Sequence, residues 1–246
     1  MPAELPGRGI FITGTDTGVG KTIIAATLAT LLRARGVSVG VMKPVETGIN
    51  DLTSMGPDAR LLRASSGCSA ADQIIAPYRF APPVAPALAA SKAGIKIDLQ
   101  HICDCYRQLA ANHDYVIVEG AGGLMVPLAG GLLTCDLVTL LQLPLLIVTR
   151  PTLGTINHTL LTIFAARTME LPVSGFVINR MPATPELAEQ EAPHTLASLA
   201  SASLLGVLPQ VDDGSPTEIT TTLAATWREA ATFGWATAAL NITPYF

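Results

Sequence analysis

The sequence predicts an α/β fold with a mostly parallel central sheet and helices on both faces. Short apolar runs rich in Val and Ile alternate with longer helical segments along the chain. Apolar residues make up 49% of the sequence and charged residues 14%, which suits a sheet that is buried on both faces. No long linker or repeat interrupts this alternation, so we expect a single domain over residues 1–246.

Six apolar runs are predicted as the strands of this sheet, because each carries Val or Ile and is bounded by Gly, Pro or Asn. They are Gly9–Thr13, Ser38–Met42, Tyr115–Val118, Leu145–Thr149, Gly175–Ile178 and Leu204–Leu208. Helices are predicted at residues 21–35, 58–65, 97–112, 155–170 and 186–200. Alternation of this kind is typical of parallel strands joined by crossover helices.

Two segments fit the alternation less well. Residues 67–95 are rich in Ala and Pro, and we expect a loop-bearing insertion near the functional site. After Gly214, a short helical patch is expected around Leu223–Ala231. No function is predicted for the remainder of the tail.

Composition argues against several classes of protein. A formal net charge of −4 and a pI near 5.5 disfavour nucleic acid or an anionic membrane surface as the main partner. The most apolar stretch, residues 132–148, is interrupted by Asp136, Gln142 and Pro144, so no membrane span is expected. The N-terminal residues lack the features of a secretory signal. The four cysteines have no spacing typical of a zinc site and are interpreted as free thiols, which favours a cytoplasmic location.

The segment Gly14–Thr22 is the most informative motif, since a Gly-rich turn here joins a predicted strand to a predicted helix. In such a loop, backbone N–H groups and the helix N-terminus face a polyphosphate. Lys21 would add a mobile charge, and the Thr22 hydroxyl could bind Mg²⁺. Five residues separate Gly14 from Gly20, one more than in the common pattern. The context predicts a P-loop NTPase-like fold that binds ATP, and the alternative is a turn whose glycines only satisfy geometry.

Charged residues also follow the second and third predicted strands. Lys43 ends an apolar strand, where a lysine needs a counter-charge or water. We interpret it as a cation aimed at a phosphoryl or carboxylate group; the alternative is a lysine that reaches solvent at the rim. Glu119 stands where phosphate-loop enzymes place the acid that fixes Mg²⁺, and its alternative role is in a helix cap or turn. Polar residues at 150–158 and 179–180 follow two more strands, and such strand ends share one edge of a parallel sheet.

Asp58 and the histidines give weaker signals. Asp58 follows Gly56-Pro57 at a predicted helix start, and by sequence alone a helix cap is the better interpretation. The four histidines, at positions 101, 113, 158 and 194, have no spacing typical of metal ligands. The sequence offers no Ser/His/Asp or Cys/His arrangement that would predict nucleophilic catalysis.

Four motifs together resemble those of the dethiobiotin synthetases. They are Gly-Thr-Asp-Thr-Gly-Val-Gly-Lys-Thr at 14–22, Lys-Pro-Val-Glu-Thr-Gly at 43–48, Val-Glu-Gly-Ala-Gly-Gly at 118–123 and Leu-Gly-Thr-Ile-Asn-His at 153–158. Their order and spacing also match, and the longer phosphate loop with Asp16 and Thr17 is characteristic of that family. The resemblance covers residues 9–210, approximately.

The resemblance implies an ATP- and Mg²⁺-dependent ring closure in biotin biosynthesis. The substrates would be 7,8-diaminopelargonic acid and carbon dioxide or bicarbonate, and the products dethiobiotin, ADP and phosphate. Lys21 would stabilise the transferring phosphoryl group. Thr17 and the catalytic Lys43 would hold the substrate carbamate, and Thr47 would contact the diamine. Mg²⁺ would be held by Thr22, Asp58 and Glu119.

The same resemblance implies a homodimer whose active sites lie at the interface. Residues Gly154, Thr155, Ile156 and Asn157 of the second subunit would receive the substrate carboxylate at a helix N-terminus. Asn179 would contact the adenine, in a pocket lined by Pro209, Gln210 and Val211. The other implied nucleotide-binding residues are Gly18, Val19, Gly20, Ile23, Gly120, Ala121, Gly122 and Arg180. Arg180 replaces an Asp of some members, which leaves adenine selectivity open.

Alternatives from other classes also remain. A synthetase of the cobyrinic acid a,c-diamide type would be expected to continue into a glutaminase domain, yet no Gly-rich motif around a nucleophilic Cys is present. A partitioning or septum-positioning ATPase switch would carry an extra Lys in the loop, where Asp16 stands here. A binding module without catalysis would not need the full set of Lys21, Thr22, Lys43 and Glu119.

Overall fold

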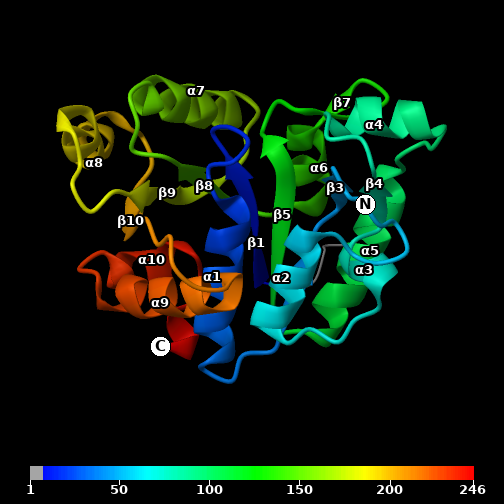
Figure 1. Ribbon diagram of the computed structural model, residues 1–246, viewed down its shortest axis with the longest axis horizontal. Helices are drawn as coiled ribbons and strands as arrows, with labels where there is room; N and C mark the ends of the chain where they lie inside the picture. The colour runs from blue at the N-terminus through cyan, green and yellow to red at the C-terminus, as the bar shows by residue number, and fades with distance from the viewer. Residues whose placement is uncertain (1–7) are drawn as a thin grey trace.

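The computed structural model describes residues 8–246. Its centre is a sheet of six parallel strands in the order β10-β9-β8-β1-β5-β2 (Figure 1). The strands are β1 (Arg8–Gly14), β2 (Val39–Met42), β5 (Tyr115–Gly123), β8 (Leu145–Thr149), β9 (Val173–Met181) and β10 (Leu204–Pro209). The predicted α/β fold with a parallel central sheet is confirmed.

Helices cover both faces of this sheet (Figure 1). One layer packs α1 (Lys21–Arg33), α2 (Pro57–Ser66) and α9 (Pro216–Glu229) against one another. The other layer contains α5 (Leu99–Asn112), α6 (Thr134–Leu141), α7 (Thr155–Thr168) and α8 (Leu187–Leu199). Helix α1 joins β1 to β2, at one edge of the sheet. The later connections, through α5, α6, α7 and α8, lead stepwise in the opposite direction to β5, β8, β9 and β10. Because strand–helix–strand crossovers are right-handed, opposite directions place these helices on opposite faces.

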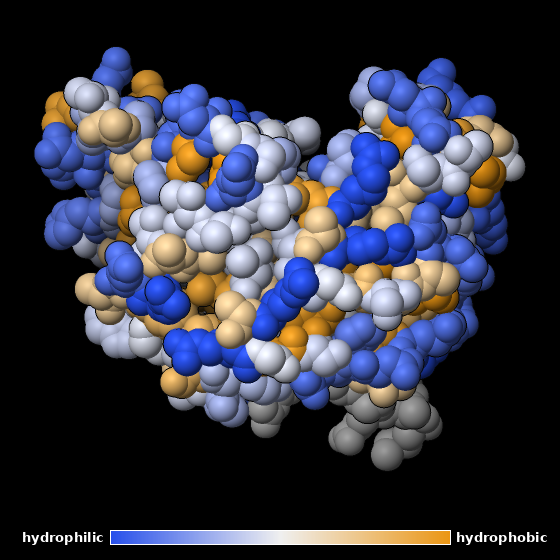
Figure 2. Space-filling model, turned by 60° about the horizontal axis from the view of Figure 1, so that its bottom comes forward, coloured by the Kyte–Doolittle hydropathy of each residue, from blue (hydrophilic) through white to orange (hydrophobic). Residues whose placement is uncertain are grey.

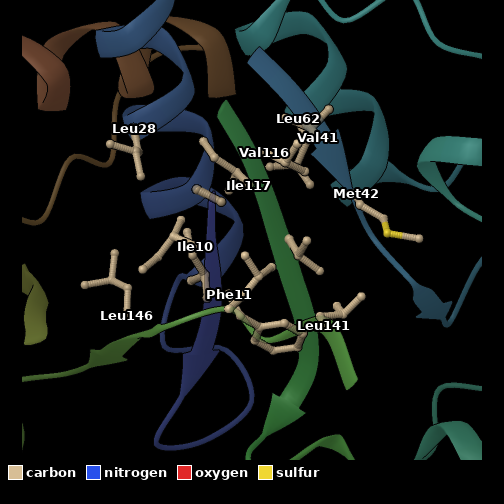
Figure 3. Close-up of a cluster of buried hydrophobic side chains, with 14 of the residues drawn as sticks. Ile10, Phe11, Leu28, Val41, Met42, Leu62, Val116, Ile117, Leu141 and Leu146 are labelled. Carbon is tan, nitrogen blue, oxygen red and sulfur yellow. The ribbon is translucent and has the colours of Figure 1, made fainter. Parts of the chain in front are cut away.

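Neighbouring residues of β1 contribute to both halves of the core. Ile10 and Phe11 are fully buried, and successive side chains of a strand point to opposite faces. Figure 3 shows Phe11 beside Leu141 of α6, whereas Leu28 and Leu62 project from α1 and α2. Burying a side chain of this size contributes about 1.5–3 kcal/mol. The core therefore fixes β1 from both sides, and with it the start of the Gly-rich loop.

Residues 67–95 are more regular than predicted. They contain α3 (Asp72–Ile75), β4 (Tyr78–Phe80) and α4 (Pro86–Ala93), and β4 pairs in parallel with β3 (Val45–Thr47). The expected loops lie between these elements, at residues 67–71, 76–77 and 81–85. Pro86 stands in the first turn of α4, where the missing N–H of proline costs no intrahelical bond.

The apolar run 132–148 contains a helix that was not predicted. Helix α6 occupies its first half and ends at Leu141, and the φ of 54° at the following Gln142 turns the chain toward β8. A short antiparallel pair, β6 (Pro127–Ala129) and β7 (Leu132–Leu133), precedes it. A buried helix and a buried strand are both continuous apolar runs, so periodicity did not separate them.

The tail is also more ordered than predicted. Helix α9 begins at Pro216, earlier than the expected patch, because Ser215 caps it by accepting a hydrogen bond from the Glu218 amide at 3.3 Å. Trp227 of α9 is buried, and its indole N–H donates to the Leu205 carbonyl at 2.9 Å. Helix α10 (Phe233–Ala239) and a 3₁₀ turn (Thr243–Tyr245) follow. The tail thus completes the layer formed by α1 and α2.

The surface is of mixed polarity. On the face drawn in Figure 2, hydrophilic and hydrophobic residues are interspersed, and the molecule is hollowed between two lobes at the upper edge. Within residues 8–246, no helix has both the length and the apolar composition that crossing a bilayer requires. The four cysteines are buried and carry free thiols, as predicted.

Candidate functional site

The Gly-rich loop runs from the end of β1 to the start of α1. Gly20 precedes α1 with φ of 95° and offers no side chain for capping. A Cβ atom at this position would lie 2.1 Å from Nδ2 of Asn179, so only glycine fits. Gly18, at φ of 76°, also has the left-handed backbone that favours glycine. The first amides of α1 have no partner within the helix, so they can bind an anion.

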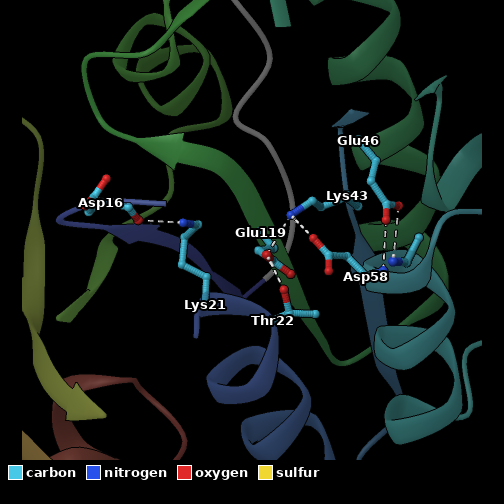
Figure 4. Close-up of polar contacts among 8 residues, drawn as sticks. Asp16, Lys21, Thr22, Lys43, Glu46, Asp58 and Glu119 are labelled. Carbon is cyan, nitrogen blue, oxygen red and sulfur yellow. Dashed lines mark hydrogen bonds and ion pairs between the residues drawn. The ribbon is translucent and has the colours of Figure 1, made fainter. Parts of the chain in front are cut away.

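Lys21 lies across the mouth of this loop (Figure 4). Its ammonium donates to the backbone carbonyl of Asp16 at 3.0 Å, while the side chain of Asp16 accepts from the Thr17 amide at 2.6 Å. Burial lowers the pKa of Lys21, and the carboxylate of Glu119 opposes that effect. The present acceptor of Lys21 is neutral, so a phosphate oxygen would be a stronger partner.

A second cation is buried beside the loop (Figure 4). The ammonium of Lys43 lies 2.6 Å from Oε1 of Glu119 and 2.8 Å from Oδ2 of Asp58. The hydroxyl of Thr22 donates to the same Oε1 at 2.8 Å. Strand register explains the contact between Lys43 and Glu119. Met42 of β2 pairs with Val118 of β5, so the residues that follow them lie side by side.

The electrostatics of this cluster keep Lys43 charged. Burial alone would lower the pKa of Lys43, but the carboxylates of Glu119 and Asp58 outweigh it and raise that pKa. Burial likewise opposes ionisation of Asp58, yet the charge of Lys43 lowers the pKa of Asp58 below its usual value. Burial raises the pKa of Glu119, and Lys43 opposes that shift. Lys43 is therefore a fixed cation at neutral pH and not a proton acceptor.

The oxygen atoms of the cluster fit a hard divalent cation. Oε2 of Glu119 is buried and lacks a hydrogen-bond partner among residues 8–246. It lies in the same cluster as the Thr22 hydroxyl and the Asp58 carboxylate, and Mg²⁺ prefers oxygen ligands of this kind. The described residues contain no group of three His, Cys, Asp or Glu side chains placed for a metal. Mg²⁺ does not require such a group, because it usually takes one or two carboxylates together with waters and phosphate oxygens.

These residues line one cavity of about 740 Å³ at the carboxyl edge of the sheet. The predicted site residues that line it are Thr17, Gly18, Gly20, Lys21, Thr22, Ile23, Lys43, Thr47, Asp58, Glu119, Ala121, Gly122 and Arg180. Residues 83–86, which lead into the first turn of α4, also line it, so part of the segment 67–95 lies at the site as expected. Pro216 reaches it from the start of α9.

Other predicted residues lie outside the cavity lining. Asn179 is buried, and its side-chain amide donates to the carbonyl of Val19 at 3.0 Å, which braces the Gly-rich loop. Gly120 packs against Phe11, where a Cβ would approach the ring to 2.8 Å. Residues 209–211 follow the end of β10, and the amide of Gln210 donates to Met181. Adenine recognition by these residues stays a prediction.

Residues 154–157 form the start of α7, and a chain of hydroxyl groups links this helix to the Gly-rich loop. Thr149, at the end of β8, lies 3.0 Å from Oγ1 of Thr15 and 2.8 Å from Oγ1 of Thr155. Thr159 donates to the same Thr149 hydroxyl at 3.0 Å. Thr149 thus uses its one donor and two acceptor sites, and it ties α7 to the loop.

Sequence reasoning assigned no role to a buried carboxylate in the cavity wall. Glu46 follows Lys43 by three residues, and both its oxygens accept backbone hydrogen bonds from the first turn of α2, at 2.8 Å from the Asp58 amide and 3.3 Å from the Ala59 amide. Asp58 is therefore not the cap that its position suggested. The signal available in the sequence was Gly56, which offers no capping side chain before Pro57 and so requires an acceptor from elsewhere.

Comparison with known proteins identifies the family. A protein-family profile described as an AAA domain matches residues 8–218. The chain is 43% identical over 213 residues to the ATP-dependent dethiobiotin synthetase BioD of Bacillus licheniformis, covering 86% of this chain and 90% of that protein. It is 46% identical over 173 residues to the protein of the same name from Anaeromyxobacter dehalogenans, covering 70% and 77%.

A solved structure of a ParA family ATPase from Chlorobium tepidum TLS gives a TM-score of 0.54, covering 97% of this chain and 98% of that chain. Its sequence identity of 17% indicates a common fold alone. The two synthetases are far more similar in sequence and match over most of their length. The chain therefore belongs to the family of ATP-dependent dethiobiotin synthetases.

Proposed function

We propose that this protein is a dethiobiotin synthetase, which uses ATP and Mg²⁺ to close a ureido ring on 7,8-diaminopelargonic acid with carbon dioxide. The single observation that carries the proposal is the shared cavity. It brings the Gly-rich loop, the cation of Lys43 and the oxygen atoms around Glu119 to one edge of the sheet. Residues 1–246 would form one catalytic domain.

The reaction divides into three bond changes. One amine of the substrate bonds to the carbon of carbon dioxide and loses a proton to water, which gives a carbamate. A carbamate oxygen then attacks the γ-phosphorus of ATP, and the bond from that phosphorus to ADP breaks. The second amine attacks the carbamate carbon and loses a proton to water, the carbon–oxygen bond to phosphate breaks, and phosphate leaves as the ring closes.

The residues of the cavity suit charge stabilisation and positioning. Phosphoryl transfer needs in-line placement and cations near the spreading negative charge, with little covalent chemistry from the protein. Lys21 would exchange the Asp16 carbonyl for a phosphate oxygen. Lys43, held as a cation, would bind the carbamate together with Thr17, and Thr47 would contact the diamine. Holding two reactants in place can contribute about 7–11 kcal/mol in well-oriented cases.

Thr22, Asp58 and Glu119 would hold the metal ion. When bound, Mg²⁺ supplies positive charge to the phosphate oxygens of ATP. The buried Oε2 of Glu119, which has no partner among residues 8–246, supports this assignment. The Asp58 side chain is 38% exposed, so it is open to a ligand that enters the cavity.

We infer that two copies of the chain form a homodimer with the active sites at the interface. The N-terminus of α7 would receive the substrate carboxylate in the partner's cavity. Leu153 is 91% exposed just before α7, and Leu161 and Phe164 are exposed along it. Such apolar exposure on one helix supports a contact with a second copy. The free buried thiols support the reducing cytoplasm as the compartment.

A direct assay tests the proposed function. The purified protein is incubated with ATP, Mg²⁺, bicarbonate and 7,8-diaminopelargonic acid, and dethiobiotin is measured by mass spectrometry. Lys43→Gln should leave nucleotide binding nearly intact and abolish ring closure. ATP hydrolysis without any dethiobiotin would favour the ATPase switch, whose fold this chain shares. Turnover by Lys43→Gln at the normal rate would remove Lys43 from the mechanism.

A further inference from the structure

The N-terminus of α2 is completed by a residue from another element. An α-helix begins with amides that have no partner within the helix. In α2, Pro57 has no N–H, and the Arg60 amide donates to the Gly56 carbonyl at 3.0 Å. The two amides between them, of Asp58 and Ala59, both donate to the carboxylate of Glu46. Glu46 thus satisfies the free donors of this turn.

Gly56 leaves the space that this contact requires. A Cβ at Gly56 would lie 2.3 Å from the carboxylate carbon of Glu46. The usual capping residues Ser, Thr, Asp and Asn are therefore excluded from this position while Glu46 occupies it. The φ and ψ of Gly56, −68° and 171°, are open to any of those residues, so space and not backbone conformation requires the glycine.

This arrangement frees the Asp58 side chain. Asp and Glu in the first turn of a helix often bond to the free amides themselves. Here the amide of Asp58 is held by Glu46, while its carboxylate points the other way and lies 2.8 Å from the Lys43 ammonium (Figure 4). Glu46 is 3% exposed and lines the same cavity as the Gly-rich loop.

We propose that Glu46 is a positioning residue that fixes the first turn of α2 so that the Asp58 carboxylate meets Mg²⁺ and Lys43. The inference rests on the proposed function, because it assumes that Asp58 is a ligand of the metal. Residues that hydrogen-bond to a metal ligand and orient it typically contribute about 10- to 100-fold to metal affinity. We expect an effect of this order for Glu46. Loss of Glu46 should therefore weaken metal binding through Asp58, without removing any ligand.

The test measures Mn²⁺ binding by electron paramagnetic resonance, with the full chain and a non-hydrolysable ATP analogue. Glu46→Ala should weaken Mn²⁺ binding about tenfold. Gly56→Ser should do the same, since its side chain collides with the Glu46 carboxylate. The double variant Glu46→Ala/Gly56→Ser should recover binding, because the introduced serine hydroxyl then has room to cap the helix in the usual way.

A matched control separates this role from general stability. Asp98 caps α5 by accepting from the Gln100 amide at 2.8 Å, away from the cavity. Asp98→Ala should lower the melting temperature and leave Mn²⁺ binding unchanged. If Glu46→Ala lowers the melting temperature but binds Mn²⁺ as well as the wild type, the inference is wrong. Failure of the double variant to recover binding would also refute it, because the cap would not be the cause.

The proposed function and this inference fail in different ways. A wild-type protein that binds no Mn²⁺ with nucleotide and makes no dethiobiotin contradicts the proposed function. If the wild type binds Mn²⁺ with nucleotide and makes dethiobiotin, and Glu46→Ala binds Mn²⁺ with the same affinity, only the role of Glu46 is contradicted. If Glu46→Ala does not fold, two other variants give the same comparison. They are Glu46→Gln, which keeps the side-chain volume and one acceptor oxygen, and Gly56→Ser.

Discussion

Replacement of Lys43 by Met should destabilise the fold as well as abolish activity. Lys43 is 4% exposed and Glu119 is 1% exposed, and their charged atoms lie 2.6 Å apart. At an effective dielectric constant of about 20, two unit charges at this distance attract by about 6 kcal/mol. In the variant, Glu119 keeps its desolvation penalty and loses that attraction. Removing one partner of a buried ion pair typically costs about 3–5 kcal/mol, and we expect a loss in this range at a pH of about 7.5.

Urea unfolding followed by tryptophan fluorescence measures this loss, since the buried Trp227 becomes exposed on unfolding. The double variant Lys43→Met/Glu119→Gln should recover most of it, because the glutamine leaves no fully buried charge unpaired, and the other partner of Lys43, Asp58, is 38% exposed and keeps contact with solvent. The loss should also shrink as the pH falls. Burial raises the pKa of Glu119, and without Lys43 nothing of equal strength opposes it. The folded variant then gains stability through proton binding as the pH falls through that raised pKa, and the gain is complete below the unfolded value of about 4.3.

Two results would refute this reasoning. The first is a stability of Lys43→Met within about 0.5 kcal/mol of the wild type near neutral pH, the scatter of ordinary surface substitutions. The second is an equal loss at pH values of about 7.5 and about 5, which would mean that an unpaired Glu119 charge is not the cause.

Three further predictions concern the loop and its supports. Lys21→Gln should abolish most turnover while the protein stays folded, as expected if Lys21 stabilises the moving phosphoryl group; unchanged formation of dethiobiotin in the mass-spectrometric assay would contradict that role. Gly20→Ala should cost about 1–3 kcal/mol in urea unfolding and weaken ATP binding in calorimetry, because its methyl group collides with Asn179 and its φ is positive. Thr149→Val should lower stability by about 1–3 kcal/mol, since it leaves buried hydroxyls without their shared partner. An unchanged melting temperature in Thr149→Val would show that these hydroxyls find other partners.

The Gly-rich loop shows which features can be predicted from residues that are adjacent in the sequence. Its position between an apolar strand and a helix could be predicted because the glycines, Lys21 and Thr22 are adjacent in the chain. Strand runs, their alternation with helices and the family motifs were equally local patterns. Helix α6 was missed because an apolar run fits a buried helix as well as a buried strand, and only packing decides between them.

The candidate site shows what local patterns leave open. Asp58 looked like a helix cap, because its position in the first turn is typical of one. Only the fold brings Glu46 to that turn and so frees the Asp58 carboxylate for Lys43. Metal and substrate binding by these residues stays a prediction, which the binding and activity experiments test.

By itself, the sequence determined the fold class, the phosphate-binding loop and the family, because each is written in residues close together along the chain. The tertiary structure decided which distant side chains meet, namely Lys43 with Glu119 through strand register and Glu46 with the start of α2 through the space left by Gly56. The physical reason is that pairing across strands and between layers depends on registers and distances, which local residue patterns do not encode.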